Sequence, residues 1–322
     1  MKRTTKINSA VIFLLAIILL LTGCSRESVQ PIDREAAILN AEGLQLLTAK
    51  HYDLAIEKLE AAVEKSPGNK AFTTNLAFGY YRAGRFDEAI EQFERAISTD
   101  PDDALIYYDY GRCLDKAGYF EQALPQLQKA AELGTDEAKL PNILFELSMC
   151  YEALGMLDMS IETIRRAIEK TPRAEYYTKI GDSLQEMGDV EGAEFEYLNA
   201  IDISPNYAPA MNNLGLMLST NDRKDEGMKL FEMVIDRDPF NAPAYNNLAL
   251  EYWEQGDLES AIDSIKDAIK SEPSNALYHY HYAMFLKDSG QDEKAIEEIQ
   301  ITLQYDPNNP DALAKLQEWQ GE

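Results

Sequence analysis

The sequence predicts an all-α protein whose helices stack in pairs as a solenoid. Three regularities predict this class. Prolines recur with spacings of 34, 71, 33, 34, 34 and 34 residues, columns of small residues keep a constant register between them, and a glycine lies midway through most repeats. Fixed periods of this length are typical of repeat proteins, because one helix pair buries its apolar face only when neighbouring pairs stack on it. The prolines are Pro67, Pro101, Pro172, Pro205, Pro239, Pro273 and Pro307.

The chain begins with a segment typical of a secretory signal. Lys2, Arg3 and Lys6 precede an unbroken apolar run from Ala10 to Leu21. Twelve apolar residues suit the core of a signal peptide, whereas a transmembrane helix needs about 20. We therefore expect residues 1–23 to be a signal peptide.

The run ends in Leu21-Thr22-Gly23-Cys24, which resembles the lipobox of bacterial lipoproteins. The resemblance implies cleavage before Cys24, a diacylglycerol on its thiol and an acyl chain such as palmitate on its amino group. Two or more chains anchor a protein firmly, whereas one binds only marginally. Ser25 resembles the sorting signal for an outer-membrane lipoprotein facing the periplasm of a Gram-negative bacterium, and residues 24–35 would be the lipidated tether. An ordinary secretory signal with a chance cysteine is the alternative.

Eight repeat units follow in register. Each is expected to contain a first helix, a glycine turn and a second helix, with small residues where the two helices approach and a proline that stops the second helix. The small columns are Gly43, Ala77, Gly111, Ser148, Gly181, Gly215, Ala249, Ala283 in the first helices and Ala55, Ala89, Ala123, Ser160, Ala193, Gly227, Ala261, Ala295 in the second. The expected turns lie at Gly84, Gly118, Gly155, Gly188, Gly256 and Gly290. The expected units are 36–69, 70–103, 104–140, 141–173, 174–207, 208–241, 242–275 and 276–309.

This pattern resembles the tetratricopeptide repeat, with eight copies over about residues 36–307. The seventh unit carries it best, with Tyr245, Leu248, Ala249, Tyr252, Gly256, Ala261, Ile265, Ala268 and Pro273. The resemblance implies a right-handed α-solenoid whose first helices line a concave face, which in that family often grips an extended peptide. Residues 310–322 are expected to form a capping helix that packs Leu313, Leu316 and Trp319 on the last repeat.

The third unit departs from the pattern. Thr135 replaces the closing proline, Pro125 lies inside the second helix, and three extra residues fall within 134–140. We interpret these changes as an insertion tolerated in a loop, with a functional hinge as the alternative.

Composition excludes several functions. The 322 residues include 30 Lys+Arg and 56 Asp+Glu, a net charge of −26, which argues against a nucleic-acid partner because phosphate binding needs basic side chains. Three histidines and three cysteines leave little room for a metal site or a disulfide scaffold. At 45% hydrophobic residues, the chain is too apolar to be wholly disordered.

No catalytic motif is present, so we expect no enzyme, no cofactor and no metal. His51 lies in an expected turn, and His279 and His281 would point away from each other on a helix. Cys113 and Cys150 occupy equivalent positions in adjacent repeats and are expected to pack as small apolar residues. A disulfide between them is the less favoured alternative.

Partner-binding candidates come from the first helices. Asparagine amides both donate and accept hydrogen bonds, so a column of them could hold a peptide backbone of any sequence. Tyr108, Arg112 and Lys116 share one helical face, and with Arg82 they form a basic cluster that could bind a carboxylate. The chaperone-type carboxylate clamp is excluded, since no three consecutive units carry its residue set. The remaining candidates are Asn75, Asn212, Asn213, Asn246, Asn247, Trp253 and Tyr280.

The sequence therefore predicts a lipid-anchored envelope scaffold or adaptor that binds a protein segment and assists an envelope machine such as a type IV pilus or secretion system. Two alternatives stay open. One is a structural spacer or oligomerisation module without a peptide ligand, which includes a homo-oligomer, and the other is an adaptor for murein hydrolases. A fold of this kind hosts many roles and does not choose among them.

Overall fold

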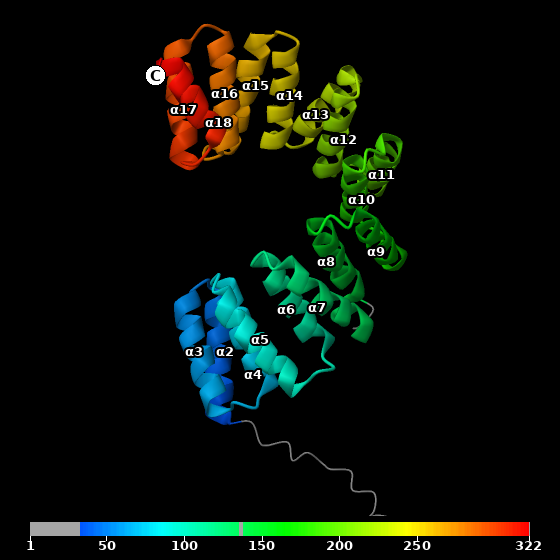
Figure 1. The fold of residues 1–322 in the computed structure, drawn as a ribbon, viewed down its shortest axis with the longest axis vertical. Coiled ribbons are helices and arrows are strands. Elements are labelled where there is room, and N and C mark those ends of the chain that lie inside the picture. Colours follow the sequence, from blue (N-terminus) through cyan, green and yellow to red (C-terminus); the bar gives the residue numbers. More distant parts are fainter. Residues whose placement is uncertain (1–32, 135–137, 322) are drawn as a thin grey trace, which may run out of the picture. The chain divides into compact units, whose positions relative to one another are not determined.

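The computed structural model describes residues 33–134 and 138–321. Over these residues it contains seventeen α-helices and no strand, which confirms the predicted all-α solenoid (Figure 1). The chain divides into two compact units at Asp100 and Pro101, and each unit is described by itself. The predicted signal peptide, Cys24 and most of the tether lie outside the described residues.

Counting described residues alone, the first unit holds two helix pairs, and the second holds six pairs and one further helix. Within each pair the two helices run side by side (Figure 1). The first unit contains α2 (Arg34–Thr48), α3 (Tyr52–Lys65), α4 (Lys70–Arg82) and α5 (Phe86–Thr99). The second contains α6 (Ala104–Lys116), α7 (Phe120–Leu133), α8 (Leu140–Ala153), α9 (Leu157–Lys170), α10 (Ala174–Glu186), α11 (Val190–Ile203), α12 (Ala208–Thr220), α13 (Lys224–Arg237), α14 (Ala242–Glu254), α15 (Leu258–Ser271), α16 (Ala276–Asp288), α17 (Asp292–Tyr305) and α18 (Pro310–Gln320).

The turn inside each pair needs one residue in the left-handed conformation. The six glycines predicted for these turns all have φ between 71° and 82°. Glycine is favoured there because it lacks the Cβ that makes this conformation costly. At the equivalent positions of the first and sixth pairs the residues are Lys50 and Asp222, each with φ of 62°.

Small residues in the two predicted columns allow close approach of paired helices. A Cβ built on Gly181 would lie 2.6 Å from Cε1 of Tyr197, and one built on Gly227 would lie 2.5 Å from the carbonyl oxygen of Gly215. Real Cβ contacts are never this short, so α12 and α13 approach more closely than any alanine pair could. The large side chains opposite the glycines, such as Tyr197 and Phe231, are fully buried.

Polar caps and prolines set the ends of the helices. The side chains of Asn69, Asp103 and Asn275 accept hydrogen bonds from backbone N–H groups in the first turns of α4, α6 and α16. Such caps satisfy donors that the helix leaves unpaired. The second helices that precede a recurring proline end two residues before it, as at Ile203 before Pro205, because the residue before proline disfavours the helical conformation.

Helix α18 covers the end of the last pair, with one correction to the prediction. Ala312 is completely buried against Ala283 and Ile299, and Leu316 and Trp319 pack on the same cluster. Leu313 is 44% exposed and therefore does not face the last repeat. Residues 312, 316 and 319 lie on one face of the helix because they are spaced by four and three positions, whereas residue 313 lies outside that face.

The irregular third pair keeps a helical second element. Helix α7 runs from Phe120 to Leu133 with Pro125 inside it and ends at Gly134, which has φ of 67°. Thr135 and two following residues lie outside the described part of the chain. Among the helices that the structure describes, none is both long and apolar enough to cross a bilayer.

Candidate partner-binding face

The first helices of the six pairs in the second unit carry most of the candidate residues. We call the surface formed by α6, α8, α10, α12, α14 and α16 the helix-A face. Polar side chains link neighbouring first helices along it, which orders the face without any ligand. The links are Arg112 Nε–Glu146 Oε1 (3.1 Å), Lys179 Nζ–Glu152 Oε2 (2.6 Å), Asn213 Nδ2–Asp182 Oδ1 (2.8 Å), His281 Nδ1–Asn246 Oδ1 (2.7 Å) and Trp253 Nε1–Asp288 Oδ2 (2.7 Å).

Asn213 lies in a cavity of about 350 Å³ between α10, α11 and α12. Its Nδ2 donates to Oδ1 of Asp182, which also accepts a hydrogen bond of 2.9 Å from the Tyr197 hydroxyl. Burial raises the pKa of the Asp182 carboxyl, and the two donors oppose that rise. Leu216 completes one wall and is 43% exposed. The other lining residues are Gln185 and Glu186.

The tandem asparagines do not act alike. Asn212 is buried, and its Nδ2 donates to Oδ1 of Asn241 over 3.2 Å. Asn241 caps α14 by accepting from the backbone N–H of Ala244, so Asn212 bonds to the start of the next repeat. Asn246 is also buried and bonds to His281, as well as donating over 3.4 Å to Oδ1 of Asn247.

Asn213 and Asn247 are the half-buried members of the two tandems. Among the described residues, Oδ1 of Asn213 and Nδ2 of Asn247 have no hydrogen-bond partner. One amide thus keeps an acceptor and the other keeps a donor on the helix-A face. An extended peptide backbone requires both.

The predicted aromatic candidates are held by neighbouring helices. The Trp253 ring packs 5.3 Å from that of Phe285, while its Nε1 donates to Asp288. Tyr280 packs against the cluster that α18 covers, beside Trp319. Both rings are half-buried, so each offers one edge to a partner.

The basic cluster on α6 is surrounded by carboxylates. The Arg112 guanidinium lies 5.3 Å from the Tyr108 ring and contacts Glu146 and, at 3.9 Å, Asp109. Lys116 Nζ is 3.8 Å from Asp115. A carboxylate from a partner would therefore have to displace an acid that is already present.

Burial has a larger effect on the pKa values of these acids than the nearby cations have. It raises the pKa of Asp109 to about 6 and raises the pKa values of Asp115 and Glu146. Three acids around two bases leave this part of the helix-A face short of positive charge.

Two candidates belong to the first unit. Asn75 donates from Nδ2 to Oδ1 of Asn40 over 2.9 Å, which links α4 to α2. The Arg82 guanidinium lies over the rings of Tyr52 and Phe78, 5.9 and 5.7 Å from their centroids. Arg82 therefore has its own aromatic partners, and its role beside Arg112 stays a prediction.

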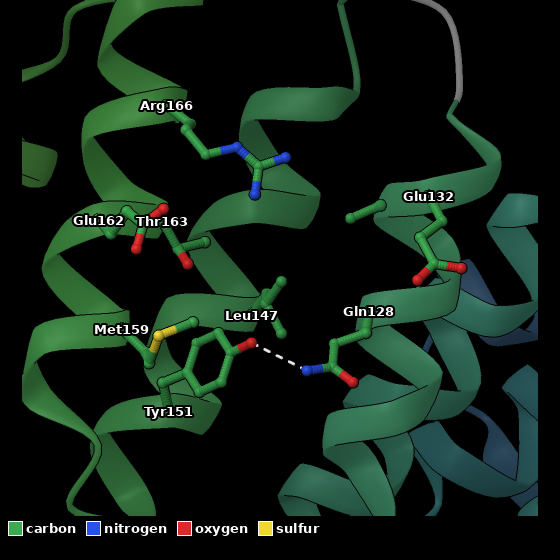
Figure 2. A pocket seen from close by; sticks show the side chains of 9 residues that line it. Gln128, Glu132, Leu147, Tyr151, Met159, Glu162, Thr163 and Arg166 are labelled. Atoms are coloured by element: carbon green, nitrogen blue, oxygen red, sulfur yellow. Dashed lines mark hydrogen bonds between the residues drawn. The ribbon is translucent and has the colours of Figure 1, made fainter.

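A second cavity, of about 290 Å³, lies between α7 and α9 and is also lined by Leu147 and Tyr151 of α8. Figure 2 shows the Tyr151 hydroxyl accepting a 2.9 Å hydrogen bond from Nε2 of Gln128, and the Arg166 guanidinium reaching toward the space between the walls. Glu132 and Glu162 stand on opposite walls. The sequence indicated an irregularity in the third repeat unit through Pro125 and the extra residues, but it did not predict the cavity.

The histidines and cysteines have structural surroundings. His279 contacts Glu298 on α17 and His281 contacts Asn246 on α14, so the two rings bind in different directions. The Glu298 side chain is 18% exposed where it makes this contact. Cys113 and Cys150 are completely buried thiols without a disulfide, as favoured from the sequence.

Sequence reasoning missed Asp182, Tyr197, Gln185 and Glu186. Asp182 and Gln185 face the same helical surface as other first-helix candidates, which was a usable signal. Tyr197 belongs to a second helix, outside the set of first-helix candidates, and its ring is buried while its hydroxyl donates to Asp182 at the cavity.

Comparison with known families decides the classification. One model of the tetratricopeptide repeat matches residues 46–92, 80–140 and 252–319, and another matches residues 141–172 and 174–207. The chain belongs to the tetratricopeptide repeat family. The family's fold is that of a protein-interaction scaffold, so a protein partner is the general expectation.

Many solved structures have similar folds, and two of them illustrate the likeness. The crystal structure of the APC/C hetero-tetramer Cut9–Hcn1 matches with a TM-score of 0.55 at 14% identity over 96% of this chain. The match spans only 59% of that larger chain. PilF from Pseudomonas aeruginosa matches with a TM-score of 0.54 at 17% identity over 70% of this chain and 99% of PilF. At these identities the likeness shows the fold alone. No curated protein matches the sequence.

Proposed function

We propose that the protein is a non-catalytic scaffold of the bacterial envelope, anchored by lipid on Cys24, that holds an extended segment of a protein partner in the concave groove of the helix-A face. The observation that carries the proposal is the pair Asn213 and Asn247. Their unsatisfied acceptor and donor lie in consecutive repeats of an ordered face. A preformed surface of this kind binds a segment without paying to rearrange itself.

The lipobox and the short tether support a position of the first helix pair close to a membrane. Helix α2 starts at Arg34, ten positions after Cys24, a span of at most about 35 Å when extended. An envelope machine such as a type IV pilus or a secretion system is the assembly we favour. The likeness to PilF agrees with that choice in fold only.

The test of the groove is crosslinked capture from the native envelope with the Asn213→Ala, Asn247→Ala double variant. We expect partner capture to fall while the melting temperature stays nearly unchanged, because neither side chain is in the core. Gln300→Ala is the matched control, since it removes an exposed amide from second helix α17. Equal capture by the double variant would favour the spacer or oligomerisation module instead.

The anchor is tested separately. Cys24→Ser should abolish acylation, seen by mass spectrometry, and release the chain from the membrane fraction. Unaltered fractionation would place the anchor elsewhere and would leave the groove proposal standing.

A further inference from the structure

We propose that the cavity at Asp182 receives a lysine or arginine side chain, so that the segment bound on the helix-A face is a basic peptide. This inference rests on the proposed function and names the chemistry of the partner.

The first argument is the set of groups that line the cavity. Its six lining residues include the carboxylates of Asp182 and Glu186 and no cationic side chain. The two groups that bond to Asp182, the Tyr197 hydroxyl and the Asn213 amide, are neutral, and both use Oδ1. Among the described residues, Oδ2 of Asp182 and the carboxylate of Glu186 have no partner. The cavity is therefore rich in acceptors and lacks positive charge.

The nearest cation does not supply that charge. Lys179 lies one helical turn before Asp182, but its Nζ is bound to Glu152 at 2.6 Å. Lys179 and Glu152 neutralise each other, which leaves the two cavity acids uncompensated. Burial raises the pKa of Asp182 although Lys179 opposes the rise, the response expected of a carboxylate that is short of a counter-ion.

The second argument is shape. The cavity is at the small end of the range for ligand pockets, about 300–1,000 Å³, which suits one long side chain. Leu216 forms an apolar wall that is 43% exposed. Lysine and arginine lay their hydrocarbon stems along apolar surface and place the charge at the end. A stem over Leu216 would bring the charged group to Asp182 and Glu186.

The third argument is the charge of the whole chain. With a net charge of −26, the protein attracts basic partners and repels acidic ones at long range. The three acids around Arg112 and Lys116 extend the same preference along the helix-A face.

The test is selection from a phage-displayed library of random dodecapeptides on the full chain in detergent. We expect peptides enriched in lysine and arginine. Each enriched peptide should bind at least roughly tenfold more weakly to the Asp182→Asn, Glu186→Gln variant, since both carboxylates that pair with the basic side chain lose their charge. The Glu169→Gln, Glu191→Gln variant is the matched control, because it removes two exposed acids of α9 and α11 that do not line the cavity. Its affinity should stay within about twofold.

Replacing the basic residue of the peptide by norleucine completes a double-mutant cycle, in which the loss of binding affinity is measured for both proteins. The loss should be large on the natural chain and small on the Asp182→Asn, Glu186→Gln variant. If Asp182→Asn unfolds the protein, the Glu186→Gln variant alone, whose side chain is exposed, should still weaken binding severalfold. Binding should also weaken on acidification as Asp182 takes up a proton, with Lys179, Glu152 and Glu186 as its charged neighbours.

The outcomes separate the two proposals. Enriched peptides that lack basic residues but are lost with Asn213→Ala, Asn247→Ala would overturn the cationic site and keep the groove. Basic peptides that bind the Asp182→Asn, Glu186→Gln variant and the natural chain equally would also overturn it. If no peptide is enriched, the groove proposal fails and the cationic site fails with it.

Discussion

At the scale of single residues, His279 and His281 show how two neighbouring side chains acquire opposite charge preferences. His279 faces the Glu298 carboxylate through Nδ1 at 2.7 Å and the Pro273 carbonyl through Nε2 at 3.0 Å. Both partners are acceptors, which favours the charged ring that donates from both nitrogens, and the Glu298 hydrogen bond raises the pKa of His279. His281 contacts the neutral Asn246 amide through Nδ1 and lies beside the Tyr280 and Phe285 rings, and burial lowers the pKa of its ring to about 4.

His281 should make the fold sensitive to acid. Its pKa is near 6.5 when unfolded and about 4 when folded, so its contribution to stability is complete above pH 6.5 and is lost as the pH falls toward 4. Between pH 7 and pH 5 the natural chain should lose at most about 2 kcal/mol through this group. Urea unfolding at both pH values should show a smaller loss for His281→Asn. An equal loss in both proteins would assign the acid sensitivity to other groups. His279 acts in the opposite direction, because its stabilisation is lost as the pH rises through its raised pKa.

Lys50 and Asp222 carry backbone strain that glycine would relieve. Both have φ of 62° at turns where the other pairs have glycine. A lysine in the left-handed conformation costs about 1–2 kcal/mol of folding free energy. Replacement by glycine recovers only part of this, because glycine has greater conformational freedom in the unfolded chain. Lys50→Gly should therefore stabilise the first pair by roughly 0.5–1 kcal/mol, and Asp222→Gly should gain less because aspartate tolerates this conformation better.

The measurement is chemical unfolding of each variant beside an alanine control. Lys50→Ala keeps the strained backbone and should give no gain, so a gain from alanine equal to that from glycine would show that the lysine side chain, not φ, was unfavourable.

At the scale of helix pairs, the contact between α12 and α13 is set by two glycines. Because a Cβ on Gly227 would lie 2.5 Å from the Gly215 carbonyl oxygen, Gly227→Ala must push the two helices apart. We expect a loss of about 2 kcal/mol in unfolding free energy, within the range for overpacked cores. Gly68→Ala is the control, since a Cβ there meets no atom within 4 Å. A neutral Gly227→Ala would mean that the pair is not held at this separation.

The same pairs explain what could be predicted from sequence. Close approach of the two helices in a pair requires small residues at fixed spacing. The turns, the positions of the small residues and the helix ends can therefore be predicted from the sequence of a single repeat. The Asp182 cavity does not follow such a rule, because Asp182, Tyr197 and Asn213 come from three helices of two repeats. Asn212 and Asn213 look equivalent in the sequence, yet one residue of helical rotation turns Asn212 toward Asn241 and leaves Asn213 on the helix-A face.

At the scale of the whole molecule, charge should make stability depend on salt. The chain carries 56 acids and 30 bases, so repulsion between like charges exceeds attraction over most of the surface. The ion pairs are mostly between partly exposed side chains, such as Lys58–Glu42 and Lys266–Asp263. Pairs of this kind contribute little, with a median of about 0–1 kcal/mol.

Screening should therefore remove more repulsion than attraction. Raising the NaCl concentration from about 0.02 to 0.5 M shortens the screening length well below 10 Å, and we expect the melting temperature to rise by several degrees. KCl at equal ionic strength should give the same rise, because screening depends on charge and not on the identity of the cation. A melting temperature that falls with both salts would mean that the specific ion pairs, including Arg112–Glu146 and Lys179–Glu152, outweigh the excess of acids.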